Sequence, residues 1–172
     1  MSLRWTAVCT AFVMFTAMTS LQAQSPAMPA TAGETLSGKK IVLADVVRGH
    51  AVVLVAGFSH DGGIACGDWM KAIHSDAALA GVDVYEIAML EGAPGLFRGM
   101  IKSGMRKGMS SADQERMVVL TQDDKAWEKY FAVSNGQSPQ VMVLDAKGNV
   151  VWHGQGRAAE LESKLRAAVS SH

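Results

Sequence analysis

The sequence predicts an α/β fold in which helices cover both faces of a mixed central sheet. Residues 51–58, AVVLVAGF, form a continuous apolar run rich in valine, which is typical of a parallel strand buried on both faces. A helical pattern over residues 69–79 and a second apolar strand over 82–89 complete a strand–helix–strand unit. Residues 140–153 form two strands around a glycine-containing turn, and a helical pattern follows over 157–169. We therefore expect a three-layer sandwich with a C-terminal β-hairpin and a last helix.

The sequence also predicts the helices and strands that lie before and between these segments. Residues 33–47 contain Ser-Gly between two short strand-like pieces and predict a hairpin. Residues 96–107 indicate a helix that carries two glycines. Residues 116–121 contain Met-Val-Val-Leu and indicate a short buried strand. Residues 123–131 begin with acids and place aromatic residues on one face, as a helix does.

The N-terminal segment has the order of a secretory signal. Arg4 precedes an apolar core of about 14 residues, and a short polar stretch then ends in a small residue. A helix that spans a membrane needs roughly 20 residues, so an uncleaved anchor is the weaker alternative. We expect an exported protein, periplasmic or extracellular, made of a signal peptide, a flexible leader and one domain, at residues 1–23, 24–33 and 34–172.

Charge and cysteine count restrict the function. Removal of the signal leaves 15 basic and 16 acidic residues, so nothing favours nucleic-acid binding. The chain has two cysteines, and Cys9 leaves with the signal, so Cys66 is the one thiol of the exported protein and no internal disulfide is expected. We expect a monomer that needs no cofactor.

Two blocks resemble the thioredoxin-like superfamily, in particular its exported group. The first is TLSGKKIVLADVVRGHAVVLVAGF, which ends in the buried strand, and the second is SPQVMVLDAKGNVVWHGQG. The resemblance covers about residues 33–169. It implies a thioredoxin-like sandwich in which Pro139 is cis and faces the redox turn.

A narrower resemblance lies in SNGQSPQVMVLDAKGNVVWHGQGRAAELESKL. This stretch is similar to the thioredoxin-like assembly-factor family of mitochondrial ATP synthase. The matching positions are Asn135, Leu144, Asp145, Gly148, Trp152, Gly154, Gly156 and Glu160. Pro139 and the export signal depart from that family's pattern, so the likeness implies shared ancestry of a domain rather than a shared task.

The position of Cys66 leaves two registers open. Without a gap after Phe58, Cys66 falls on the second cysteine of the superfamily's redox pair, where it would be buried with Trp69 and Ile73. With a longer loop, Cys66 would start the helix and Trp69 would replace the second cysteine. An exposed thiol at a helix start has a lowered pKa and exchanges disulfides, whereas a buried one is an apolar filler.

An enzyme built on Cys66 would be a monothiol oxidoreductase. Cys66 would be the nucleophile, His60 would assist with Asp61 as its orienter, and Pro139 would shape the peptide site. A peroxidase is less well supported because Gly63 stands where such enzymes place a threonine.

The segment FRGMIKSGMRKGM predicts a basic amphipathic helix with adaptable methionines. Such a helix docks on a protein partner or, weakly, on a membrane surface, although a solvated face over a core stripe gives the same pattern. The expected partner-binding residues are Arg98, Met100, Lys102, Met105, Arg106 and Trp69. Thioethers also suit Cu(I), and the candidates would be Met100, Met105, Met109 and Met117; ordinary packing is the commoner role, and we expect no metal.

The sequence therefore predicts a non-catalytic binding or assembly factor for a protein partner. The alternative is the monothiol oxidoreductase, whose partner would be a thiol-containing peptide.

Overall fold

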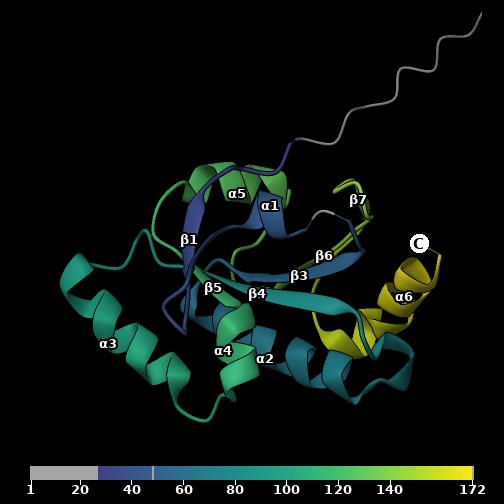
Figure 1. Cartoon of the computed structure of the whole chain (residues 1–172), viewed down its shortest axis with the longest axis horizontal. Helices are drawn as coiled ribbons and strands as arrows, with labels where there is room; N and C mark the ends of the chain where they lie inside the picture. The colour runs from purple at the N-terminus through teal and green to yellow at the C-terminus, as the bar shows by residue number, and fades with distance from the viewer. Residues whose placement is uncertain (1–26, 48, 172) are drawn as a thin grey trace, which may run out of the picture.

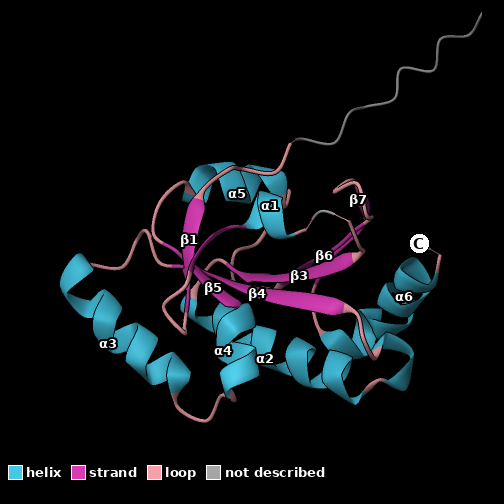
Figure 2. Ribbon diagram, in the orientation of Figure 1, coloured by secondary structure: helices cyan, strands magenta, loops and turns pink. Residues whose placement is uncertain are grey.

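A mixed sheet forms the middle layer of the protein (Figures 1 and 2). The computed structural model describes residues 27–47 and 49–171. Its strands lie in the order β2-β1-β5-β4-β3-β6-β7. They are β1 (Ala32–Thr35), β2 (Lys40–Val42), β3 (Val52–Gly57), β4 (Asp83–Met89), β5 (Met117–Leu120), β6 (Gln140–Leu144) and β7 (Val150–Gln155).

The strand β3 is the centre of the sheet and its directions explain why the sheet is mixed. It pairs in parallel with β4, and β4 pairs in parallel with β5. On its other side β3 pairs antiparallel with β6, which turns back into β7. The N-terminal hairpin β1–β2 adds to β5 antiparallel. The predicted parallel unit and the C-terminal hairpin are thus confirmed.

Helices cover both faces, which confirms the three-layer architecture (Figure 1). One face carries α1 (Leu43–Val46) and α5 (Asp124–Tyr130), and the other carries α2, α4 and α6, with α3 at its margin. The bounds of these are α2 (His60–Ser75), α3 (Gly95–Arg106), α4 (Ser111–Arg116) and α6 (Ala158–Ser170), and a short 3₁₀ turn, η1, spans Ala77–Leu79. No helix in the described part of the chain is long and apolar enough to cross a membrane.

Each face of the sheet has its own core. Under α1 and α5, Trp127 and Phe131 are fully buried against alternate residues of β3 and β6. Under α2 and α6, Trp69, Ile73 and Leu165 bury the other set of alternate residues. This division follows from the two-residue period of a strand, which sends successive side chains to opposite faces.

The helix α2 begins nine residues earlier than the predicted range, directly after Ser59. Ser59 caps it, because its hydroxyl accepts a hydrogen bond from the Gly62 N–H at 3.0 Å. The glycines in its first turns made a loop the expected structure. Close approach requires glycine at one position in this first turn and at one before it, since a Cβ on Gly62 would lie 2.8 Å from the Gly136 carbonyl and one on Gly57, at the end of β3, would lie 2.7 Å from the Gly63 backbone. Tertiary packing thus overrides the low helix propensity of glycine.

Two further differences from the sequence-based expectation concern α4 and Pro139. The short helix α4 was not predicted, and Ser110 caps it by accepting the Asp113 N–H. The described residues contain no cis peptide bond, so the expected cis form of Pro139 is wrong. The trans form is the lower-energy state of most X-Pro bonds, and here it places the Pro139 carbonyl where the Gly156 N–H donates to it at 3.2 Å.

The indole of Trp69 ties α2 to the end of the hairpin, and this contact can be tested. Its Nε1–H donates to the Gly156 carbonyl at 2.8 Å. Trp69→Phe should lower the free energy of unfolding by about 1–3 kcal/mol through the unpaired acceptor alone, in addition to lost packing. Urea denaturation measures this loss. Trp152→Phe is the control, because the Trp152 indole makes no hydrogen bond within the described chain; equal losses for both variants would contradict the role of the bond.

Candidate functional site

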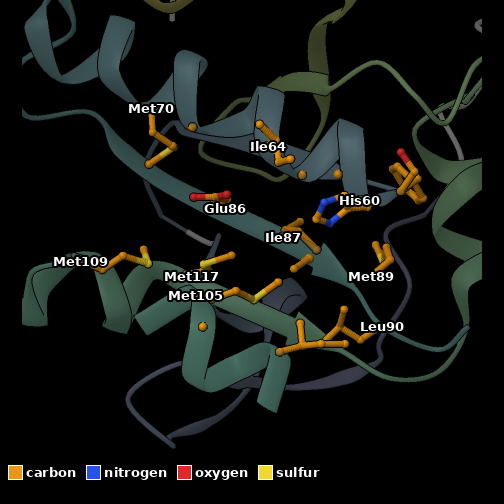
Figure 3. Close-up of a pocket in the computed structure, with 18 of the residues that line it drawn as sticks. His60, Ile64, Met70, Glu86, Ile87, Met89, Leu90, Met105, Met109 and Met117 are labelled. Atoms are coloured by element: carbon orange, nitrogen blue, oxygen red, sulfur yellow. The ribbon is translucent and has the colours of Figure 1, made fainter. Parts of the chain in front are cut away.

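A large cavity lies between α2 on one side and α3 and α4 on the other, over the C-terminal half of β4 (Figure 3). Its volume is about 980 Å³, which is the size of a ligand or peptide site. Most of its lining is apolar, and the residues that Figure 3 labels are His60, Ile64, Met70, Glu86, Ile87, Met89, Leu90, Met105, Met109 and Met117.

Glycines open the α2 wall of this cavity. Gly63 and Gly67 lie on the face of α2 that lines it, and a Cβ at either position would meet no atom within 4 Å. The exposed side chain of Ile64 and the half-buried one of Met70 stand beside them. The missing side chains therefore leave room that no described residue fills.

Methionines form much of the opposite wall. Met117 of β5 is buried, and Met105 of α3 and Met109 pack against its cluster together with Ile101. In Figure 3 their sulfur atoms lie close to one another beside the cavity. Methionine is unbranched and polarisable, so such a wall adapts to apolar side chains of different shapes.

The carboxyl group of Glu86 lies in the floor of the cavity. On the sheet, Glu86 is opposite Val55 of β3 and Met117 of β5, so its neighbours on both sides are buried and apolar. No hydrogen bond or ion pair joins Glu86 to another described residue. Burial, and secondarily the charge of Asp113, raises the pKa of Glu86 to about 7.

The basic side chains near the cavity either pair with another residue or are exposed. Arg116 forms an ion pair with Asp83 and lies over the Tyr85 ring, with its guanidinium carbon 5.6 Å from the ring centroid. Lys71 lies on the exposed side of α2, where its ammonium is 3.4 Å from the Asp68 carboxylate. Glu86 is therefore a carboxyl without a partner in apolar surroundings.

Glu86 was not among the residues that the sequence analysis selected. The signal was present, because a glutamate stands inside a strand, DVYEIAM, at a position that alternates with the apolar residues Val84 and Ala88. That alternation places Glu86 on the face of the sheet that α2 and α6 cover, where a charged side chain is unexpected.

The structure places Cys66 in the second turn of α2, on the face that packs on the sheet. Its exposed fraction is 1%, and it lies in one cluster with Trp69 and Ile73. The register with a buried thiol is therefore the one that occurs. Desolvation, and secondarily the charge of Glu86, raises the pKa of Cys66 far above that of a free thiol. A thiolate at an exposed helix start is not present.

The other two residues of the expected redox site do not meet Cys66. His60 is the exposed first residue of α2 and faces the cavity (Figure 3). No hydrogen bond among the described residues joins it to Asp61 or to Cys66. Pro139 is buried at the start of β6, and the loop before it packs on the start of α2, where the Gly136 carbonyl approaches Gly62. The loop before Pro139 therefore lies against the start of α2, as expected, but the described residues hold no pair of cysteines there.

The three bases of α3 are used inside the protein. Arg98 donates to the carbonyls of Glu91 and Ala93, both at 2.9 Å. Lys102 pairs with Glu34 of β1 at 3.0 Å. Arg106 donates from Nε to the Leu36 carbonyl at 2.6 Å. These contacts hold α3, which has no fully buried residue, to the edge of the sheet.

The other predicted partner-binding residues lie in different parts of the protein and do not form one surface. Trp69 is fully buried and faces the sheet, whereas Met100 is 66% exposed on the outside of α3. Met105 lines the cavity together with Ile101. Phe97, one turn before Ile101 on the same stripe, is 48% exposed, so the apolar surface continues out of the cavity.

Metal-ligating groups are sparse in the described residues. No group of three or more His, Cys, Asp or Glu side chains is placed to hold an ion. Of the four thioethers considered for Cu(I), Met105, Met109 and Met117 share the cavity wall, and Met100 lies outside it. Their packing with Ile101 and Leu90 accounts for their positions without a metal.

Burial of Cys66 predicts slow chemistry at its sulfur. In the full chain with Cys9→Ser, iodoacetamide should label Cys66 slowly from pH 7 to pH 9 and fast once denaturant is added, because the raised pKa and the packing both suppress the thiolate. Mass spectrometry of timed samples measures the rate. Fast labelling of the folded protein with an apparent pKa below about 8.5 would contradict the buried register.

Glu86 predicts a pH dependence of stability. Its pKa is raised from 4.5 to about 7 on folding, so its favourable contribution is complete below pH 4.5 and is lost as the pH rises through about 7. Relative to Glu86→Gln, the wild type should lose on the order of 3 kcal/mol of unfolding free energy between pH 4 and pH 8. Urea denaturation at each pH gives the difference.

The exposed Glu115, on α4, provides the control for this titration. Glu115→Gln, measured in the same way, shows how much the loss of one negative charge outside the cavity changes the unfolding free energy at each pH. A pH dependence for Glu86→Gln no larger than the one for Glu115→Gln would mean that Glu86 is not desolvated.

Solved structures with a similar fold come from redox and assembly proteins. The thioredoxin domain of a thiol-disulfide oxidoreductase from Bacteroides vulgatus has a TM-score of 0.58 at 16% identity, over 86% of this chain and 98% of that one. The exposed lipoprotein thioredoxin of Streptococcus pneumoniae has a TM-score of 0.55 at 17% identity, over 81% and 97%. Yeast Sco1 with copper bound has a TM-score of 0.55 at 14% identity, over 85% and 96%. At such identities these likenesses show the thioredoxin-like fold alone.

Sequence comparison gives the family. No curated protein matches the chain significantly. The model of the ATP10 protein family matches residues 14–172, which extends the resemblance seen in the C-terminal pattern to most of the chain. The protein therefore has a thioredoxin-like fold and belongs to the ATP10 family of ATP synthase assembly factors.

Proposed function

We propose that this chain is an exported, non-catalytic assembly factor that holds an apolar segment of a protein partner in the cavity between α2 and α3–α4. The observation that carries the proposal is the cavity itself, a mostly apolar space of about 980 Å³. Membership of the ATP10 family supports a protein partner.

The shape of the α2 wall supports binding rather than catalysis. The cavity offers methionines, exposed apolar side chains and glycines, all of which suit contact with another apolar chain. A monothiol oxidoreductase would need the Cys66 sulfur to reach a substrate disulfide, and that sulfur faces the sheet instead. The redox-type relatives of the fold leave this function as the alternative, which the alkylation of Cys66 tests directly.

The glycines of α2 allow the cavity to be filled without disturbing the fold. Gly67→Leu should place a side chain into open space, keep or raise the stability because leucine is the better helix former, and abolish partner binding. Gly99→Leu is the matched control, since a Cβ there also meets no atom within 4 Å but Gly99 does not line the cavity.

The measurement is site-specific cross-linking in the producing cell. A photoreactive amino acid at Ile64, which is 65% exposed at the cavity, should capture the partner, whereas one at the exposed Lys147 in the β6–β7 turn should not. Gly67→Leu should remove the cross-linked product, and Gly99→Leu should preserve it. A product that survives Gly67→Leu would show that the partner binds elsewhere. Recovery of the product from the exported fraction tests the location.

A further inference from the structure

We propose that the partner segment is an apolar stretch that carries one lysine or arginine, and that the Glu86 carboxylate pairs with this cation inside the cavity. The inference rests on the proposed function and adds the chemistry of the partner. It is argued from the position of Glu86, from the charges around it and from the apolar walls.

Glu86 occupies a sheet position that packing alone would give to an apolar residue. Val84 and Ala88, two residues away on the same face of β4, are buried, and so are Val55 and Met117 beside it. The carboxyl of Glu86 forms no hydrogen bond or ion pair with another described residue, and Figure 3 shows it directed into the cavity between the two walls. Glu86 is half-buried, and a carboxylate that is partly removed from water is stabilised by a partner, which can reach it from the cavity.

The charges that face the cavity leave it acidic. From α4, Asp113 adds a second acid, and Asp124 at the start of α5 adds a third, whose Oδ1 is buried without a hydrogen-bond partner. From α2, His60, Lys71 and His74 reach the lining, all three exposed, and Arg116 of α4 is paired with Asp83. None of these described bases forms an ion pair with Glu86, and an entering lysine or arginine would supply that partner.

The walls determine what must surround that cation. Ile64 and Met70 on α2 face Met105 and Met109 across Glu86, so the side chains on either side of the carboxyl group are apolar. A free metal ion or a strongly charged peptide would leave these walls unsatisfied, whereas an apolar segment with a single long basic side chain fills both requirements. Lysine and arginine also have apolar stems that can lie along such walls.

Two synthetic peptides test the proposal on the full chain. Both are twelve residues long and rich in leucine and alanine, with soluble serine–glycine ends; one has a central lysine and the other has norleucine, which has a similar length and no charge. Isothermal titration calorimetry at pH 8 should show about tenfold tighter binding of the lysine peptide. At pH 5.5 this preference should shrink, because protonation removes the charge of Glu86.

Glu86→Gln should bring the affinity ratio of the two peptides close to one at both pH values, while Glu115→Gln, which removes an equal charge outside the cavity, should keep the preference. Equal binding of both peptides to the wild type overturns the charge pairing and leaves the proposed function intact. Binding of neither peptide also overturns it, while the Ile64 cross-link with its Gly67→Leu control still decides the proposed function. If sedimentation shows a dimer that Gly67→Leu dissociates, the occupant is a second copy of the chain and the proposal is wrong.

Discussion

The rotation of α2 about its own axis is the constraint on which the rest of the structure depends. Three contacts set it: the Ser59 cap, the close approach of Gly57 to Gly63, and the hydrogen bond from Trp69 to the hairpin. With α2 held this way, the face that contains Cys66 packs on the sheet and the face that contains Gly67 borders the cavity. Since successive helical residues differ by about 100°, a rotation of α2 by one residue would direct Gly67 towards the sheet and turn Cys66 away from it.

The other wall of the cavity is held by a different kind of force. Little of α3 is buried, so hydrophobic burial contributes little to its position, and its bases bind carbonyls and Glu34 instead. A helix held by partly exposed polar contacts separates from the sheet at lower cost than a helix held by a core. We therefore expect the α3 wall to move more readily than the α2 wall, which would suit the entry of a chain segment.

Much of the fold could be predicted because burial determines the apolar pattern. The Val-rich run of β3 and the hairpin from Gln140 to Gln155 are recognisable without their neighbours. The start of α2 could not be predicted, because the glycines near residue 60 are locally typical of a loop. This start determines whether Cys66 lies at the exposed end of the helix or in its buried second turn. The bases of α3 were correctly seen as one face, but the sequence does not show that Leu36, about 70 positions away, supplies the carbonyl that Arg106 binds.

Glu86 shows why the candidate site was harder to predict than the fold. A sequence pattern assigns a charge to solvent or to an ion pair, whereas Glu86 is half-buried and has no ion pair within the described chain, which leaves its carboxyl available to something that binds. Replacement of Glu86 by valine would suit the sheet and remove the unfavourable desolvation of a carboxylate near neutral pH. A group that lowers stability in the free protein and stabilises a complex is expected at a binding site rather than in a core. The same desolvation that makes the isolated carboxylate unfavourable strengthens its attraction for a cation that enters, because the apolar walls screen the pair less than water does.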